Sequence, residues 1–135
     1  MKYWPEHIQI IFERLAEHGH EVFAVGGCVR DIIVGITPQD FDMVCSATPG
    51  QISQIFSRTL HVGARFGTVI VLIDQQQVEL STYRQVELKH EVSALEMDLA
   101  GRDFTINAMA MDVNGNVYDP WGGQADLKAG LIRAT

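Results

Sequence analysis

The sequence is poor in basic residues and in long apolar runs. Its 10 lysines and arginines stand against 17 acidic residues, a net charge of −7, so the chain offers no basic surface that would hold nucleic acid by itself. The longest apolar run, residues 69–73, is far too short to span a membrane, and the N-terminus lacks the apolar core of a signal peptide. These absences favour a cytoplasmic protein with no membrane partner.

Cysteine is also scarce. Cys28 and Cys45 are the only two, with neither CxxC spacing nor a histidine cluster beside them. A zinc site or a disulfide is therefore disfavoured, and the pattern predicts two reduced, buried thiols. With 135 residues, of which 47% are hydrophobic, the chain is long enough for one globular domain with a real core.

Periodicity along the chain predicts an α+β domain. An amphipathic stripe at Ile8, Ile11, Phe12 and Leu15 predicts the first helix, and shorter helices are expected over 29–34 and after Thr48-Pro49. Strands are predicted at 21–25, 41–45, 68–73, 77–83, 109–113 and 116–118. The hairpins and interspersed helices together indicate a small mixed β-sheet with helices mainly on one face.

Asp40 and Asp42 flank Phe41 at the start of a predicted strand. Side chains alternate along a strand, so both carboxylates would emerge on one face while Phe41 turns into the core. Two such carboxylates repel each other unless a cation lies between them, and their hard oxygens suit Mg²⁺, which also takes ligands from phosphate groups. A pair of ions could activate a hydroxyl for attack on a phosphate. The alternative is a solvated pair of surface acids.

The neighbourhood favours the metal site. Gly26 and Gly27 follow a predicted strand and precede a helix, where a backbone without Cβ can approach phosphate oxygens. Arg30, one turn into that helix, has a planar donor fork that suits phosphate. Each feature alone is common in turns and on surfaces. Together with the two aspartates they predict a triphosphate site.

Two further features are open to two interpretations. Glu79, on the second strand of the long hairpin, is either a third carboxylate that holds a metal or accepts a proton, or an exposed strand residue. In the segment 102–108, Arg102 could clamp phosphate while Asp103 and Asn107 hydrogen-bond ribose hydroxyls. The alternative for that segment is a helix start capped by Asp103.

Several segments together resemble the head of class II tRNA nucleotidyltransferases, the CCA-adding enzymes, of which bacterial poly(A) polymerases are close relatives. They are residues 25–31 (VGGCVRD), 40–42 (DFD) and 102–108 (RDFTINA), in the family's order. Residues 119–133, from DPWGG to the final Arg133, resemble the segment that closes that head. The match covers nearly the whole chain.

The resemblance implies a polymerase-β-like nucleotidyltransferase fold and Mg²⁺-dependent transfer of AMP or CMP from ATP or CTP to an RNA 3′-hydroxyl, with tRNA as the expected acceptor. It implies that Asp40 and Asp42 hold the metal and that Gly27, Arg30 and Arg102 touch the incoming nucleotide. The segment 102–107 is associated with ribose recognition, and a Glu is usual where Glu79 stands.

The chain departs from the family pattern in three places. Gly101 stands where a first Arg is usual, and residues 85–98 are shorter than the family's flexible loop and lack its Arg-Arg-Pro stretch. Because that loop is linked to adding the terminal A, nucleotide choice or the final step could be altered. The chain also stops at Thr135, where the family continues into neck, body and tail domains that select the nucleotide and hold tRNA. We expect residues 1–135 to be a catalytic head, either a fragment or one completed by a partner chain.

Two alternatives remain at this point. The same fold can transfer nucleotides to a protein or a small molecule, although the long ordered match argues against that. The chain could also be a nucleotide-binding module whose chemistry has decayed; Gly101 and the short loop keep this open, whereas Asp40 and Asp42 argue against it.

Overall fold

The computed structural model describes residues 4–61, 67–83 and 93–135. The described helices are α1 (Glu6–Glu17), α2 (Gly27–Ile33), α3 (Pro49–Ile55), α4 (Ala94–Ala100), α5 (Gly123–Ala129) and the 3₁₀ turn η1 (Thr105–Asn107). The described strands are β1 (Val22–Val25), β2 (Asp42–Cys45), β3 (Thr59–His61), β4 (Thr68–Ile73), β5 (Gln76–Thr82), β6 (Ala110–Met111) and β7 (Val117–Tyr118). None of the helices in this part of the chain has the length and apolar character that a membrane crossing requires.

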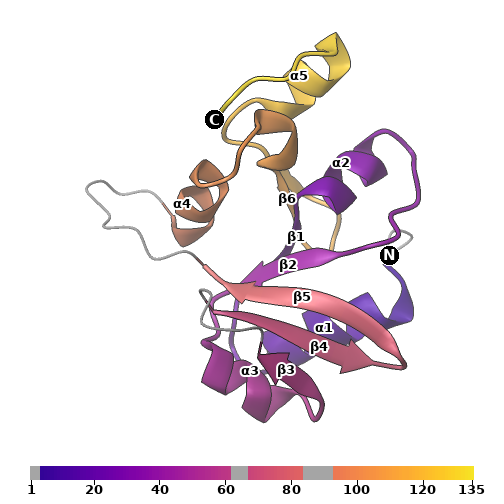
Figure 1. The fold of residues 1–135 in the computed structure, drawn as a ribbon, viewed down its shortest axis with the longest axis vertical. Helices are drawn as coiled ribbons and strands as arrows, with labels where there is room; N and C mark the ends of the chain where they lie inside the picture. The colour runs from indigo at the N-terminus through magenta and orange to yellow at the C-terminus, as the bar shows by residue number, and fades with distance from the viewer. Residues whose placement is uncertain (1–3, 62–66, 84–92) are drawn as a thin grey trace.

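The strands form one seven-stranded mixed sheet in the order β3-β4-β5-β2-β1-β6-β7 (Figure 1). Strands β2 and β5 pair in parallel, and every other neighbouring pair is antiparallel. The β4–β5 hairpin thus lies against β2 rather than at an edge. This arrangement brings the middle of the hairpin next to the start of β2, where the paired aspartates lie.

Local sequence accounts for several elements. The apolar stripe of α1 is buried at Ile8, Ile11, Phe12 and Leu15, as predicted. Helix α3 begins with a capping box, in which the Thr48 hydroxyl accepts from the Gln51 N–H while the Gln51 side chain accepts from the Thr48 N–H. The predicted hairpins at β4–β5 and β6–β7 are both confirmed, with shorter strands at the second.

The sheet has a core on each face. On β2, Met43 and Cys45 face a large core that also receives side chains from α1, α2 and α3, whereas Val44 faces a smaller one. The smaller core is covered by Leu95 and Leu99 of α4. Three helices therefore contribute to one core and α4 to the other, in agreement with the predicted α+β sheet with helices mainly on one face.

Other elements were not predicted. The strand β3 and the helix α5 have little apolar periodicity of their own. The strand β3 is only three residues long and lies at the edge of the sheet, where pairing with β4 holds it. The sequence pattern of residues 87–99 left helix and loop open, and α4 begins within this stretch, where the Ser93 hydroxyl caps it. The short loop 85–98 lies largely outside the described residues, which resume at 93.

The two cysteines are free and buried, as predicted. Burial raises the pKa of both thiols to about 11. The Cys28 thiol donates to the Val25 carbonyl at 3.2 Å, which ties the first turn of α2 to the end of β1. Both residues act as small apolar groups of the core rather than as nucleophiles.

Candidate active site

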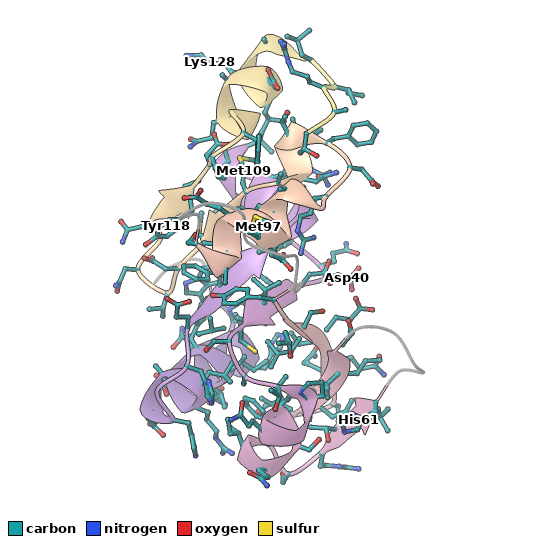
Figure 2. All side chains as sticks on the ribbon, turned by 90° about the vertical axis from the view of Figure 1, so that its left-hand side faces the viewer. Asp40, His61, Met97, Met109, Tyr118 and Lys128 are labelled. Atoms are coloured by element: carbon teal, nitrogen blue, oxygen red, sulfur yellow. The ribbon has the colours of Figure 1, made fainter. Side chains whose placement is uncertain are left out.

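Asp42 and Glu79 lie side by side on neighbouring strands. They are Cα partners in the parallel β2–β5 ladder, and their side chains alternate with residues of the large core, so both project from the opposite face. The sequence placed Asp40, Phe41 and Asp42 together on a strand, but β2 begins only at Asp42, and Asp40 lies in a bend just before it. All three acids are exposed, and Figure 2 shows Asp40 at the surface.

Phe41, between the two aspartates, turns inward. It is buried and its ring lies edge-on to Trp4 and to His7, with centroids 6.3 and 6.2 Å apart. The Trp4 indole in turn donates to the Val113 carbonyl at 3.0 Å. The bend that carries Asp40 and the first residue of β2 are therefore anchored by aromatic packing on the other side of the sheet.

The carboxylates repel one another electrostatically. Although the Asp42 side chain is exposed, the protein atoms packed around its carboxyl remove part of its hydration, and this desolvation is the largest cause that raises its pKa; the neighbouring charge of Glu79 is the second. Arg102 acts in the opposite direction and lowers the pKa, whereas Asp40 raises it further. A site that makes a carboxylate reluctant to ionise is one in which a cation would be stabilised.

A magnesium site needs few protein ligands, because Mg²⁺ keeps waters and takes phosphate oxygens beside one or two carboxylates. Within the described ranges, no three histidine, cysteine or acidic side chains converge as a ready-made metal cage. The Asp40 and Asp42 carboxylates nonetheless have the oxygen chemistry and the partial charge repulsion that fit such an ion.

Gly26 occupies the point where the strand β1, Arg102 and Asp42 meet. Its φ is +76°, and a Cβ added there would lie 3.6 Å from the Arg102 Nη1 and 3.9 Å from the Asp42 Oδ2. The positive φ is what favours glycine here, and the two distances are ordinary contacts that place the Arg102 and Asp42 side chains beside the turn. At the neighbouring Gly27, an added Cβ would lie 3.2 Å from the Arg30 Nη2.

Arg30 is joined to the third predicted cluster across the fold. Its Nη1 donates to the Asn107 Oδ1 at 3.0 Å, and its Nη2 lies 3.3 Å from the Asp31 Oδ1. The structure thus brings Arg30 of α2 and Asn107 of η1 together. Asn107 orients the Nη1 side of the guanidinium group, and Asp31 orients the Nη2 side. The half-exposed guanidinium remains accessible for a ligand.

Arg102 is held by an acid that the sequence analysis did not identify. Its Nη2 lies 3.3 Å from the Asp98 Oδ2, and the Asp98 side chain is 1% exposed. The Arg102 Nε is buried and has no hydrogen-bond partner within the described residues. An i, i+4 spacing of opposite charges could have indicated the pair from sequence. The buried pair fixes Arg102 beside Gly26 and Asp42 while leaving its donors under-satisfied.

Asp103 is not brought into this cluster by its side chain. It is exposed, it does not cap η1, and its backbone carbonyl accepts from the Thr135 N–H at 3.4 Å. The proposed capping role is therefore wrong. The Thr135 hydroxyl also donates to the Arg102 carbonyl at 2.5 Å, so the C-terminal segment pairs with the segment that carries Arg102 and Asp103.

A buried acid supports η1 from the other side. Asp126 of α5 accepts from the Thr105 hydroxyl at 2.6 Å and lies 3.3 Å from the Arg133 Nε. At Gly123, an added Cβ would collide with the Thr105 carbonyl oxygen. The start of α5 therefore packs directly under the turn that presents Asn107, which explains the glycine and the aspartate in the closing segment.

Carboxylates on two adjacent parallel strands, beside a glycine turn and a half-buried arginine, define a domain of the polymerase-β-like nucleotidyltransferase class. The Poly A polymerase head domain family matches residues 22–133. The chain belongs to that family.

Relatives and solved structures agree with this assignment. The chain is 40% identical to a CC-adding tRNA nucleotidyltransferase of Halalkalibacterium halodurans over 124 residues, 92% of the chain and 31% of that protein. It is 43% identical to a CCA-adding enzyme of Ligilactobacillus salivarius over 133 residues, 92% of the chain and 33% of that protein. The structure is similar to the Bacillus stearothermophilus CCA-adding enzyme in complex with CTP, with a TM-score of 0.85 and 36% identity over 97% of this chain and 34% of that one. The chain thus spans about a third of the length of these proteins.

Proposed function

We propose that this chain is a catalytic head that transfers a nucleoside monophosphate from CTP or ATP to the 3′-hydroxyl of an RNA, in particular a tRNA. The observation that carries the proposal is the pairing of Asp42 with Glu79 beside Gly26 and Arg102. Carboxylates that could hold a metal ion thus lie next to a backbone turn and a guanidinium group that could bind phosphate. Solved relatives include CCA-adding enzymes in complex with CTP, with ATP and with tRNA.

Asp40 and Asp42 are the residues that would hold Mg²⁺. When bound, the ion supplies charge that polarises the α-phosphate and favours ionisation of the attacking hydroxyl. Glu79, on the strand next to Asp42, would complete the ligand set or accept the proton of that hydroxyl. Transfer then proceeds by in-line displacement of pyrophosphate, without a covalent enzyme intermediate.

The nucleotide would be held by residues around the glycine turn. Gly26 and Gly27 let the backbone approach phosphate oxygens, and the guanidinium groups of Arg30 and Arg102 would pair with phosphate charge. Asn107 is oriented by Arg30 and would hydrogen-bond a ribose hydroxyl, with Asp103 as a second candidate from the same segment. Because the two side chains are hydrogen-bonded, we propose that Arg30 and Asn107 act together: a change at one position would alter the orientation of the side chain at the other.

Calorimetric binding of CTP and of ATP to the chain, with and without Mg²⁺, tests the site. We expect binding that depends on Mg²⁺ and is lost in Asp42→Ala, since that change removes a metal ligand. The matched control is Glu13→Gln, which removes one exposed acid from α1. Binding in Asp42→Ala equal to wild type would contradict the metal site and favour a decayed nucleotide-binding module.

The acceptor is tested separately with α-labelled CTP and ATP and a tRNA that lacks its 3′-terminal residues. Label at the RNA 3′ end is the expected product; label on a protein or small molecule instead would contradict the RNA assignment. Because relatives are named both as CC-adding and as CCA-adding proteins, the RNA products should be resolved to single nucleotides. If a terminal A is added from ATP, the chain does not have an activity restricted to the addition of C.

A further inference from the structure

A surface cavity of about 410 Å³ lies away from the candidate active site. Its apolar lining comes from Ile10 of α1, Phe56 after α3, and Leu72 and Ile73 of β4. Phe56 belongs to the large core, and Ile73 packs against it. The cavity therefore opens at the border of the face covered by α1 and α3, opposite the face from which Asp42 projects.

The polar rim of the cavity carries two arginines, Arg14 and Arg58. In the described part of the chain, ion pairs occupy Arg30, Arg102 and Arg133, whereas neither Arg14 nor Arg58 has an acidic partner within 4.0 Å. A protein of net charge −7 thus places, around one concavity, two guanidinium groups that have no acidic partner among the described residues. Uncompensated positive charge at a hollow favours an anionic ligand.

The third side of the rim is the turn between β4 and β5. Asp74 and Gln75 have φ values of +51° and +66°, a left-handed conformation that two-residue hairpin turns require and that glycine adopts at the least cost. Both residues line the cavity. Asp74 leaves the rim with two positive charges and one negative charge.

We propose that this cavity binds a small organic phosphate, with the phosphate group between Arg14 and Arg58 and the organic part over the apolar floor. The volume falls in the range of small-molecule sites, roughly 300–1,000 Å³. A phosphomonoester carries a charge of about −1.5 to −2 at neutral pH, which matches two guanidinium groups better than a single carboxylate does. The site is distinct from the proposed nucleotidyl-transfer site and does not depend on it.

Titration with AMP, followed by backbone amide NMR resonances, tests the proposal. We expect shifts at Ser57, Arg58 and residues 72–75, independent of any shifts at Gly26 and Gly27, where AMP could also bind. Inorganic phosphate tests the charge alone and adenosine tests the apolar floor alone. Both should bind at least about tenfold more weakly than AMP, because each lacks one half of the interaction.

Two variants and one control decide the outcome. Arg14→Gln and Arg58→Gln should each weaken AMP binding at the cavity about tenfold or more, whereas Lys128→Gln should leave it unchanged. Lys128 is exposed and carries the same single positive charge as each arginine. It lies at the opposite end of the molecule from His61 on β3, the strand that pairs with β4 (Figure 2). Absence of AMP shifts at the cavity, equal binding of inorganic phosphate, or equal weakening by Lys128→Gln would overturn the proposal. An RNA oligonucleotide that binds there when AMP does not would also overturn it.

Discussion

Asp42 and Glu79 are direct partners across the one parallel strand pair of the described sheet, and the charge of Glu79 raises the pKa of the Asp42 carboxyl. Parallel pairing needs a crossover, here the stretch from Ser46 to Gln75 that includes α3, β3 and β4. The position of the acidic cluster therefore depends on how a long connection folds back onto the sheet.

The raised pKa of Asp42 predicts how stability changes with pH. The folded chain retains this proton to higher pH than the unfolded chain, so the contribution of Asp42 to stability falls as the pH rises from the ordinary value of 3.8 through the raised folded value. We expect the Tm of wild type minus that of Asp42→Asn to decline across this window, measured by thermal unfolding without divalent cations. A difference that grows with pH would contradict the assignment.

Arg102→Ala should destabilise the fold as well as weaken nucleotide binding. The variant removes the ion pair to the buried carboxylate of Asp98, a loss we expect to cost about 1–3 kcal/mol in urea-induced unfolding. Asp98→Asn and the double variant complete a cycle that isolates the pair. If the effects of the two single variants were additive, the contact would contribute no coupling and the explanation would fail.

Thr105→Val tests the support of η1 by α5. The valine preserves the shape of the side chain but removes the donor to buried Asp126, so we expect a loss of about 1–3 kcal/mol in the free energy of unfolding. Arg133→Gln should cost less than about 1 kcal/mol, because the Arg133 side chain is 63% exposed and its pair is screened by solvent. The reverse order would mean that Arg133 is the main partner of Asp126.

Two glycine-to-alanine changes should have opposite signs. Gly123→Ala places a methyl group against the Thr105 carbonyl oxygen, and we expect a loss of about 1–3 kcal/mol or more. Gly50→Ala, inside α3, meets its nearest atom at 4.0 Å and should stabilise by about 0.5–1 kcal/mol through helix propensity. Chemical denaturation of both variants checks this, and a harmless Gly123→Ala would show that α5 can shift away from η1.

The sequence predicted features whose causes are local. The stripe of α1, the Thr48 cap and the hairpin β4–β5 follow from spacing, capping chemistry and alternation, and the inward turn of Phe41 follows from the same alternation. The glycine turn, Arg30 and the two aspartates were predicted to form one site because their residue types suit phosphate and metal chemistry. The segment 102–108 was added to that site only by the family resemblance. The sequence could not place the start of β2, which excludes Asp40, because strand ends are decided by pairing.

The sequence by itself determined which side chains could perform chemistry and which surfaces must be buried, since residue type and periodicity carry that information. Only the tertiary structure decided the contacts between them. The Arg30–Asn107 hydrogen bond, the approach of Arg102 to Gly26 and the parallel register of Asp42 with Glu79 each join distant segments. Their physical cause is the packing of the whole sheet, and burial and distance, which no local pattern encodes, then set the ionisation of Asp42 and the pairing of Asp98.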